Sequence, residues 1–211
     1  MLEGCNTEDD SVFDRQFPRW IRTKSAIHFT PVAVARHAAR LLAPTGGMKI
    51  LDVGAGVGKF CIVAAGEVPT GTFVGVELRP HLSRIAERMA RRLSISNVRF
   101  LRGDALDLDW LQYDAFYFYN PFGEQMHETA FILDRTLDLD PSRFVHYVNA
   151  VRERLRVARI GTRVVTYHGF GASPPHGYQL DESVVIGSDR LELWVKTRER
   201  TVDDAALDQA A

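Results

Sequence analysis

Residues 48–60 read Met-Lys-Ile-Leu-Asp-Val-Gly-Ala-Gly-Val-Gly-Lys-Phe, and this stretch decides the fold. The short apolar run of residues 49–53 predicts a buried strand. Three glycines at alternate positions then permit a tight turn with positive φ angles, because glycine has no Cβ. The apolar residues 60–65 predict a packed helix that follows the turn. A glycine turn between a strand and a helix presents free backbone N–H groups, to which a phosphate, a carboxylate or a ribose can bind.

The spacing of the glycines separates the cofactor classes that use such turns. A nucleoside-triphosphatase loop needs Gly-x-x-x-x-Gly-Lys-Ser/Thr, but Val53 stands in place of its first glycine and Phe60 in place of its hydroxyl. The dinucleotide fingerprint Gly-x-Gly-x-x-Gly fits at Gly54 and Gly56, but Lys59 stands in place of its third glycine. The pattern therefore excludes the triphosphatase loop and disfavours a nicotinamide-dependent dehydrogenase.

Downstream of the turn, strand and helix patterns alternate. Thr30 and Pro31 predict the N-cap and first turn of a helix that precedes the glycine stretch. Further strands are predicted at 72–77, 98–101, within 113–119 and at 163–167, helices at 80–93 and 141–159, and a final hairpin at 183–186 and 191–196. Such alternation predicts a doubly wound α/β fold, with a mostly parallel sheet and ligands at the carboxyl ends of its strands. The hairpin places one antiparallel strand at or near an edge.

Length and composition limit the function classes. The chain of 211 residues is 45% hydrophobic, which suffices for one compact domain, and its formal net charge of −1 gives no general attraction to nucleic acid or to an anionic membrane. No apolar run approaches the roughly 18–20 residues that span a bilayer, and the acidic N-terminus lacks the apolar stretch of a secretory signal. Cys5 and Cys61 form neither a disulfide framework nor a metal site. We therefore expect a cytoplasmic protein with no membrane partner and no metal.

Polar residues recur at the ends of four consecutive strands. Asp52 and the glycines end the first strand, and Glu77 ends the second at the distance expected of an acid that binds ribose. Asp104 follows the third strand, where it could accept a hydrogen bond from an adenine amino group, and Asn120 follows the fourth. Because the carboxyl ends of parallel strands meet at one edge, these residues predict a single nucleotide-like site.

The motif Asp52-Val-Gly-Ala-Gly-Val-Gly58 is similar to the first motif of the class I S-adenosylmethionine-dependent methyltransferases, and the likeness extends over roughly residues 30–197. The resemblance implies a seven-stranded, mostly parallel sheet with a C-terminal antiparallel hairpin, and S-adenosyl-L-methionine as the cofactor. It implies that Gly54 and Gly56 approach the methionine moiety, that Glu77 binds the ribose and that Leu78 packs on the adenine. The full set of cofactor-binding residues that it implies is Thr30, Asp52, Gly54, Ala55, Gly56, Glu77, Leu78, Asp104, Ala105 and Asn120.

The segment Asn120-Pro121-Phe122 resembles the Asn/Asp/Ser-Pro-Pro-Tyr/Phe/Trp motif of methyltransferases that act on planar or amide nitrogens. In those enzymes the polar side chain and a carbonyl accept hydrogen bonds from the target NH₂ group, and the ring stacks on it. Here the second proline is missing, since Phe122 and Gly123 follow Pro121 directly. The segment is also similar to a loop of the non-SET histone lysine methyltransferases. The three residues are thus the predicted catalytic set, with a nitrogen of a protein or a nucleobase as the acceptor.

Other acceptors and roles remain open. A small-molecule O- or C-methyltransferase is one alternative, and a nucleotide-binding module without catalysis is another. The methyl acceptor is thus a protein, an RNA or a small molecule. Stable DNA binding is not expected, because no separate target-recognition domain is visible and the arginine stripe Arg84, Arg88, Arg91 and Arg92 reads as a solvated helix face.

We divide the chain into an N-terminal tail and cap at 1–30, the methyltransferase domain at 31–200, and a disordered tail at 201–211. Residues 1–12 are expected to be mobile. Glu124, His127 and Glu128 are expected in a solvated loop or helix start, and His168 and His176 at the surface.

Overall fold

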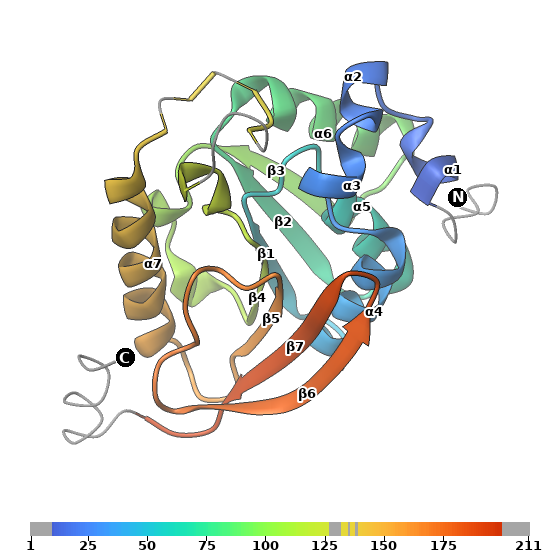
Figure 1. The fold of residues 1–211 in the computed structure, drawn as a ribbon. Coiled ribbons are helices and arrows are strands. Elements are labelled where there is room, and N and C mark those ends of the chain that lie inside the picture. Colours follow the sequence, from blue (N-terminus) through green and yellow to red (C-terminus); the bar gives the residue numbers. More distant parts are fainter. Residues whose placement is uncertain (1–9, 127–131, 135, 138, 200–211) are drawn as a thin grey trace.

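A computed structural model of the chain describes residues 10–126, 132–134, 136–137 and 139–199 (Figure 1). Seven strands form one sheet in the order β3-β2-β1-β4-β5-β7-β6. The strands are β1 (Lys49–Val53), β2 (Thr72–Glu77), β3 (Val98–Arg102), β4 (Ala115–Tyr119), β5 (Arg163–Tyr167), β6 (Tyr178–Ile186) and β7 (Asp189–Lys196). The pairs β5–β7 and β6–β7 are antiparallel and the other four pairs of neighbouring strands are parallel, so the predicted fold class is confirmed.

The order of the strands locates the ligand site. After β3 the chain crosses back over β2 and β1 to form β4 on the other side of β1. The carboxyl ends of β1 and β4 therefore border the point at which the strand order reverses, where open α/β sheets bind their ligands. Asp52 of β1 lies beside Tyr117 of β4 and Gly75 of β2 in this part of the sheet.

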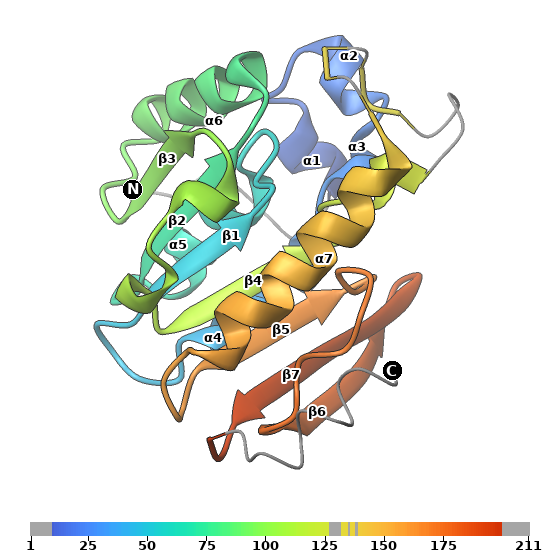
Figure 2. The same ribbon diagram turned by 90° about the vertical axis from the view of Figure 1, so that its left-hand side faces the viewer.

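Helices cover both faces of the sheet (Figure 2). The helices are α1 (Asp10–Asp14), α2 (Arg19–Arg22), α3 (Ser25–His28), α4 (Val32–Leu42), α5 (Lys59–Glu67), α6 (Pro80–Arg92) and α7 (Pro141–Arg156), with short 3₁₀ turns η1 (Ala105–Asp107), η2 (Trp110–Gln112) and η3 (Gly123–Met126). Apolar residues of α4, α5 and α6 share one core with Ile50, whereas those of α7, η1 and η2 share the opposite core with Leu51. This alternation along β1 is the two-residue period of a strand.

Several predicted boundaries shift. The helix predicted at 141–159 ends at Arg156. The strand predicted at 183–186 begins earlier, at Tyr178, and has an irregularity between Leu180 and Glu182. Its first half is polar because an edge strand is solvated, so it lacks the apolar pattern on which the prediction relied.

The N-terminal residues 10–30 form a cap of three short helices, α1 to α3, and we call them the cap segment. The expectation that residues 10–12 are mobile is wrong, because they lie in α1; residues 1–9 and the predicted tail at 201–211 are outside the described residues. Phe13, Phe17 and Ile21 are buried in the core that α5 and α6 share. No helix within the described ranges is both long and apolar enough to cross a membrane.

Thr30 does not cap α4 as predicted. The N-cap position is Pro31, which has no side-chain cap, and the N–H of Val32 instead donates to Asp10 Oδ1 at 2.9 Å. The Thr30 hydroxyl pairs with the Tyr117 hydroxyl at 3.1 Å. Asp10, at the start of the cap segment, thus accepts the hydrogen bond at the N-terminus of α4 that was predicted for Thr30.

Candidate active site

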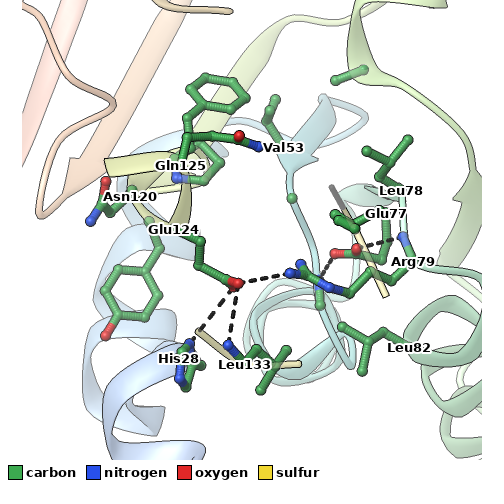
Figure 3. Close-up of a pocket in the computed structure, with 18 of the residues that line it drawn as sticks. His28, Val53, Glu77, Leu78, Arg79, Leu82, Asn120, Glu124, Gln125 and Leu133 are labelled. Carbon is green, nitrogen blue, oxygen red and sulfur yellow. Dashed lines mark hydrogen bonds and ion pairs between the residues drawn. The ribbon is translucent and has the colours of Figure 1, made fainter. Parts of the chain in front are cut away.

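A cavity of about 440 Å³ opens at the carboxyl ends of β1, β2 and β4 (Figure 3). Eight of the predicted site residues line it: Gly54, Gly56, Glu77, Leu78, Ala105, Asn120, Pro121 and Phe122. They come from the ends of β1, β2 and β4 and from η1, so the topology brings together residues that are far apart in the sequence. The predicted roles of the individual residues stay predictions.

Glu77 is the buried carboxylate of this cavity. Its side chain Oε2 accepts the N–H of Gly56 at 2.8 Å, and Oε1 accepts the N–H of Arg79 at 2.8 Å. Burial raises the pKa of Glu77, whereas the two backbone N–H groups and the Arg79 guanidinium lower it. The two hydrogen bonds from backbone N–H groups fix the carboxylate in place. Because each carboxylate oxygen can accept more than one hydrogen bond, the group can still accept from hydroxyl groups in the cavity.

The glycine turn is covered from two sides. Gly54 and Gly56 have φ angles of +77° and +56°, which disfavour any residue with a Cβ. A Cβ on Gly56 would lie 2.9 Å from Cε1 of Phe29 in the cap segment, and a Cβ on Gly54 would lie 2.9 Å from Cβ of Pro121. The backbone of the turn is therefore in close contact with the cap on one side and with the Asn120 loop on the other.

The loop after β4 is held by the loop after β5. Asn120 has a positive φ of 40°, which is uncommon for a residue other than glycine, and its N–H donates to Gly169 O at 2.9 Å. Its carbonyl accepts the N–H of Gly123 at 3.1 Å, which closes a turn around Pro121 and Phe122. The Asn120 amide lies against Gly123, where a Cβ would clash with it. Figure 3 places Asn120 across the cavity from Glu77.

One face of the predicted catalytic ring is covered. The Phe122 ring stacks on Tyr147 of α7, with centroids 4.8 Å apart and an angle of 12° between the planes. The Tyr147 hydroxyl donates to Asp104 Oδ2 at 2.6 Å, and Asp104 Oδ1 accepts the N–H of Leu106. Asp104 therefore caps η1 and anchors Tyr147, and it does not line the cavity as its neighbour Ala105 does.

Three predicted residues lie beside the main cavity. Thr30, Asp52 and Ala55 line a small adjoining pocket of about 20 Å³. Strand alternation turns Asp52 toward α5, where Cys61 Sγ donates to Oδ2 at 3.4 Å. Burial, opposed by the Cys61 hydrogen bond and assisted by the nearby Glu77, raises the pKa of Asp52 to about 7.

The sequence analysis missed an ion-pair network along the cavity wall. Arg79, which is 7% exposed, donates through Nη2 to Glu124 Oε2 at 2.7 Å and through Nε to Asp134 Oδ1 at 3.2 Å. Glu124 also accepts the N–H of Leu133, and its other oxygen lies 3.9 Å from Nδ1 of His28. Figure 3 shows Arg79, His28 and the backbone N–H of Leu133 converging on Glu124. Glu124 lies in the first turn of η3, so the predicted helix start is confirmed for it, but its side chain is half-buried and paired instead of solvated. His127 and Glu128 fall outside the described residues.

His28 lies in the same wall as a neutral imidazole. Burial, together with the charges of Lys24 and Arg79, lowers the pKa of His28 to about 4. The sequence around His28 gives no sign that this residue lines the cavity. Its neighbours there, Glu124 of η3 and Arg79 at the start of α6, are far away in the sequence.

His168 is exposed, as the sequence predicts, and it also lines the main cavity, in line with the alternative that it borders the rim of the site. It has a positive φ of 59°, and its Nδ1 lies 2.7 Å from Asp189 Oδ2. Its Nε2 lies 3.3 Å from Ser188 Oγ, so the turn between β6 and β7 fixes both ring nitrogens. Within the described ranges, no group of three or more His, Cys, Asp or Glu side chains could hold a metal ion.

Comparisons with known proteins agree with this geometry. Residues 44–138 match the family model of a methyltransferase domain. A release factor glutamine methyltransferase of Vibrio cholerae serotype O1 is 38% identical over 55 residues, which are 26% of this chain and 19% of that enzyme. A tRNA (guanine-N(7)-)-methyltransferase of Prochlorococcus marinus is 39% identical over 51 residues, 24% of each chain. This chain thus matches less than a quarter of the length of these relatives.

Two solved structures share the fold. An RNA methyltransferase from Salinibacter ruber, in complex with S-adenosyl-L-homocysteine, has a TM-score of 0.56 and 23% identity over 82% of this chain and 97% of its own. TrmN from Thermus thermophilus has a TM-score of 0.59 and 23% identity over 84% of this chain and 52% of its own. The matched segment is 95 of the 211 residues, so it shows a methyltransferase domain over less than half of the chain. This match and the shared fold agree with the predicted resemblance to the class I S-adenosylmethionine-dependent methyltransferases, the family that uses the predicted cofactor.

Proposed function

We propose that the chain transfers a methyl group from S-adenosyl-L-methionine to a nitrogen acceptor. The observation that carries the proposal is that one cavity joins the glycine turn and the fixed Glu77 carboxylate to the Asn120-Pro121-Phe122 loop. The first two fit a nucleoside with a charged amino-acid tail, and the loop fits a planar or amide nitrogen next to it.

In this proposal the residues around Glu77 hold the cofactor. Glu77 accepts hydrogen bonds from both ribose hydroxyls, while its existing bonds to the N–H groups of Gly56 and Arg79 keep the carboxylate in position. Leu78 and Ala105 form the apolar walls for the adenine. Thr30 and Asp52 border the small pocket beyond Gly54, at the side assigned to the methionine end. The cofactor, when bound, supplies an activated sulfonium methyl group.

The chain's own contribution to the reaction is to position the acceptor. Asn120 presents its side-chain amide, which makes no hydrogen bond to another described residue, at the cavity wall opposite Glu77. Phe122, whose ring Tyr147 holds by stacking, lines the same cavity and is assigned to pack against a planar acceptor group. Holding two reactants in line can supply much of the rate acceleration of such a transfer. Asn120 and the ring of Phe122 are the residues that we assign to this task.

Relatives support two classes of nitrogen acceptor. By their names, one methylates a glutamine of a release factor and another a guanine of tRNA. We therefore assign this chain an acceptor nitrogen in a protein or in RNA.

The cofactor assignment is tested by calorimetry. Purified protein is titrated with S-adenosylmethionine, with S-adenosylhomocysteine and with NAD. Glu77→Gln should weaken binding of S-adenosylhomocysteine by about 10-fold or more, because hydrogen bonds to a charged group are worth about 1.5–3 kcal/mol. The matched control is Glu153→Gln, since Glu153 is 64% exposed on α7. Binding of NAD alone would contradict the proposal.

The role of Asn120 is tested by methyl transfer. Radiolabelled S-adenosylmethionine is incubated with protein and RNA fractions of a cell extract, and the label in each fraction is counted. Asn120→Ala should abolish incorporation while S-adenosylhomocysteine still binds, and Asn149→Ala on the exposed side of α7 should leave it unchanged. Equal incorporation by Asn120→Ala would remove Asn120 from the mechanism, and binding without any incorporation would favour the non-catalytic module.

A further inference from the structure

The outer side of the cap segment carries three exposed arginines, Arg15, Arg19 and Arg22. Their backbones take part in the short helices, but none of their guanidinium groups makes a hydrogen bond or an ion pair with another described residue. They line a hollow of about 680 Å³ on the cap segment, whose lining also includes Thr23, Ala26, Lys59 and the acids Asp10 and Asp14. Most other arginines of the described chain are engaged, for example Arg40 with Glu67 and Arg156 with Glu153.

Helix α6 extends this basic area. The Trp20 ring lies 6.0 Å from the His81 ring, and Arg92 Nη2 donates to the Gln16 carbonyl at 3.2 Å, so the cap segment runs along α6. His81, Arg84, Arg88 and Arg92 are three or four residues apart and therefore lie on one side of the helix. The exposed Arg84 and Arg88 thus stand between the two points at which the cap touches α6. Figure 1 shows the cap helices and α6 at the same end of the molecule.

Within the part of the chain that the structure describes, the acids near this area are paired with other groups. Asp10 and Asp14 both pair with the buried Lys59, at 2.6 and 2.8 Å, and Glu87 lies 3.7 Å from Arg91. In a chain whose formal net charge is only −1, five exposed arginines are therefore gathered on one surface. Trp20, which is 42% exposed, lies within it. Arginines that bind phosphates, with an aromatic ring on which a base can stack, are the combination that binds single-stranded nucleic acid.

The surface adjoins the active-site cavity through α3. Ser25 and Ala26 line the arginine hollow, whereas the next two residues, Ile27 and His28, line the cavity. Phe29 lines both, and its ring covers the glycine turn. The arginine hollow and the active-site cavity are therefore neighbours that share a wall at α3 and Phe29.

We propose that the basic cap surface, formed by Arg15, Arg19, Trp20, Arg22, Arg84 and Arg88, binds single-stranded RNA that carries the methyl acceptor. This rests on the proposed function, and of the two acceptor classes named there it selects RNA. The sequence analysis interpreted the arginine stripe of α6 as a solvated face, and the contacts of Trp20 and Gln16 with that helix give the stripe a neighbouring basic segment.

The test measures RNA binding apart from activity. A fluorescein-labelled, mixed-sequence RNA of about 20 nucleotides, longer than a typical single-stranded site, is titrated with the full chain and followed by anisotropy at several salt concentrations. Arg19→Ala/Arg22→Ala should weaken binding by at least about 10-fold at low salt and reduce the slope of log K against log salt by about 1.4, since each lost phosphate contact removes about 0.7.

A second variant separates stacking from charge. Trp20→Ala should weaken RNA binding by roughly 10-fold, as the loss of one stacked base does, and leave the salt slope unchanged. The matched control Arg156→Ala/Arg190→Ala removes two arginines on α7 and on the β6–β7 hairpin, away from the cap, and should bind RNA as the unaltered chain does. Circular dichroism and binding of S-adenosylhomocysteine should be the same for all variants.

The outcomes are distinct. Absence of RNA binding, an equal loss in the control variant, or binding of single-stranded DNA or poly-glutamate as tight as that of RNA would each overturn the proposal. RNA binding that depends on the cap arginines in a chain that binds no S-adenosylhomocysteine would leave the RNA surface standing and refute the proposed function instead.

Discussion

Lys59 provides a direct test of how the cap segment is attached. It stands where the dinucleotide motif has its third glycine, and its side chain is 2% exposed. Its Nζ lies 2.6 Å from Asp10 Oδ1, 2.8 Å from Asp14 Oδ1 and 3.1 Å from Ser25 Oγ. One buried ammonium group at the start of α5 thus joins α1 and α3 to the helix that follows the glycine turn.

The effect of Lys59→Met can be worked out from these contacts. Removing one partner of a buried ion pair costs about 3–5 kcal/mol, because the other charge remains buried without compensation. The Asp14 side chain is 12% exposed and bears this cost, whereas that of Asp10 is 47% exposed and is screened by water. We therefore expect the lower end, about 3 kcal/mol, and a release of the cap that is roughly 150-fold more frequent.

Trypsin measures that release directly, because the cap contains Arg15, Arg19 and Arg22. When opening is fast relative to cleavage, the rate of proteolysis follows the population of the open state. Cleavage after these arginines should accelerate strongly in Lys59→Met, and Asp14→Asn in the same chain should restore part of the protection. The control is Lys49→Met, which removes a half-buried lysine 4.7 Å from the Tyr113 ring. Unchanged cleavage at the cap would refute the assigned role of Lys59.

Three further substitutions test other contacts. Burial raises the pKa of Asp52 from its ordinary 3.8 to about 7. The stability that the neutral carboxyl contributes is therefore complete below pH 3.8 and is lost as the pH rises through about 7, by up to about 4 kcal/mol. In urea unfolding, Asp52→Asn should not show this decrease in stability across the same pH range. Gly54→Ala places a Cβ 2.9 Å from Pro121 at a φ of +77°; it should cost about 1–2 kcal/mol of stability and weaken binding of S-adenosylhomocysteine in calorimetry. Lys196, 1% exposed, donates to two carbonyls at the end of α7 at 2.9 and 2.6 Å; Lys196→Met leaves them without this donor and should lower the free energy of unfolding by about 2–4 kcal/mol.

The sequence predicted those parts of the fold whose signals are local. The bounds of β1, β2 and β5 agree with the prediction because short, buried parallel strands are continuous apolar runs. The glycine turn and Glu77 were found for a similar reason, since the spacing between a turn and the end of the next strand is fixed by the βαβ unit.

Contacts between distant segments could not be predicted in this way. Arg79 looked like an ordinary helix-start residue, yet its partners Glu124 and Asp134 lie 45 and 55 residues away. His168 became a cavity residue because the turn between β6 and β7, some 20 residues further on, fixes its ring. A local pattern contains no information about such partners, so the ion-pair network of the cavity wall and the role of the cap appeared only in the folded chain.

The departure at Lys59 connects these two kinds of evidence. A third glycine at that place would allow close packing of the helix against the strand, as in dinucleotide-binding folds, but it could not bind a neighbouring segment. A lysine there forms ion pairs with Asp10 and Asp14, and the cap that they hold sets the Phe29 ring against Gly56. The same residue that argues against a dinucleotide site therefore stabilises the cap over the cofactor turn. Release of the cap would uncover the glycine turn and separate the arginine surface from the cavity. Lys59→Met should therefore weaken binding of S-adenosylhomocysteine as well as expose the cap to trypsin. Faster cleavage without any loss of binding would show that the cap does not contribute to the cofactor site.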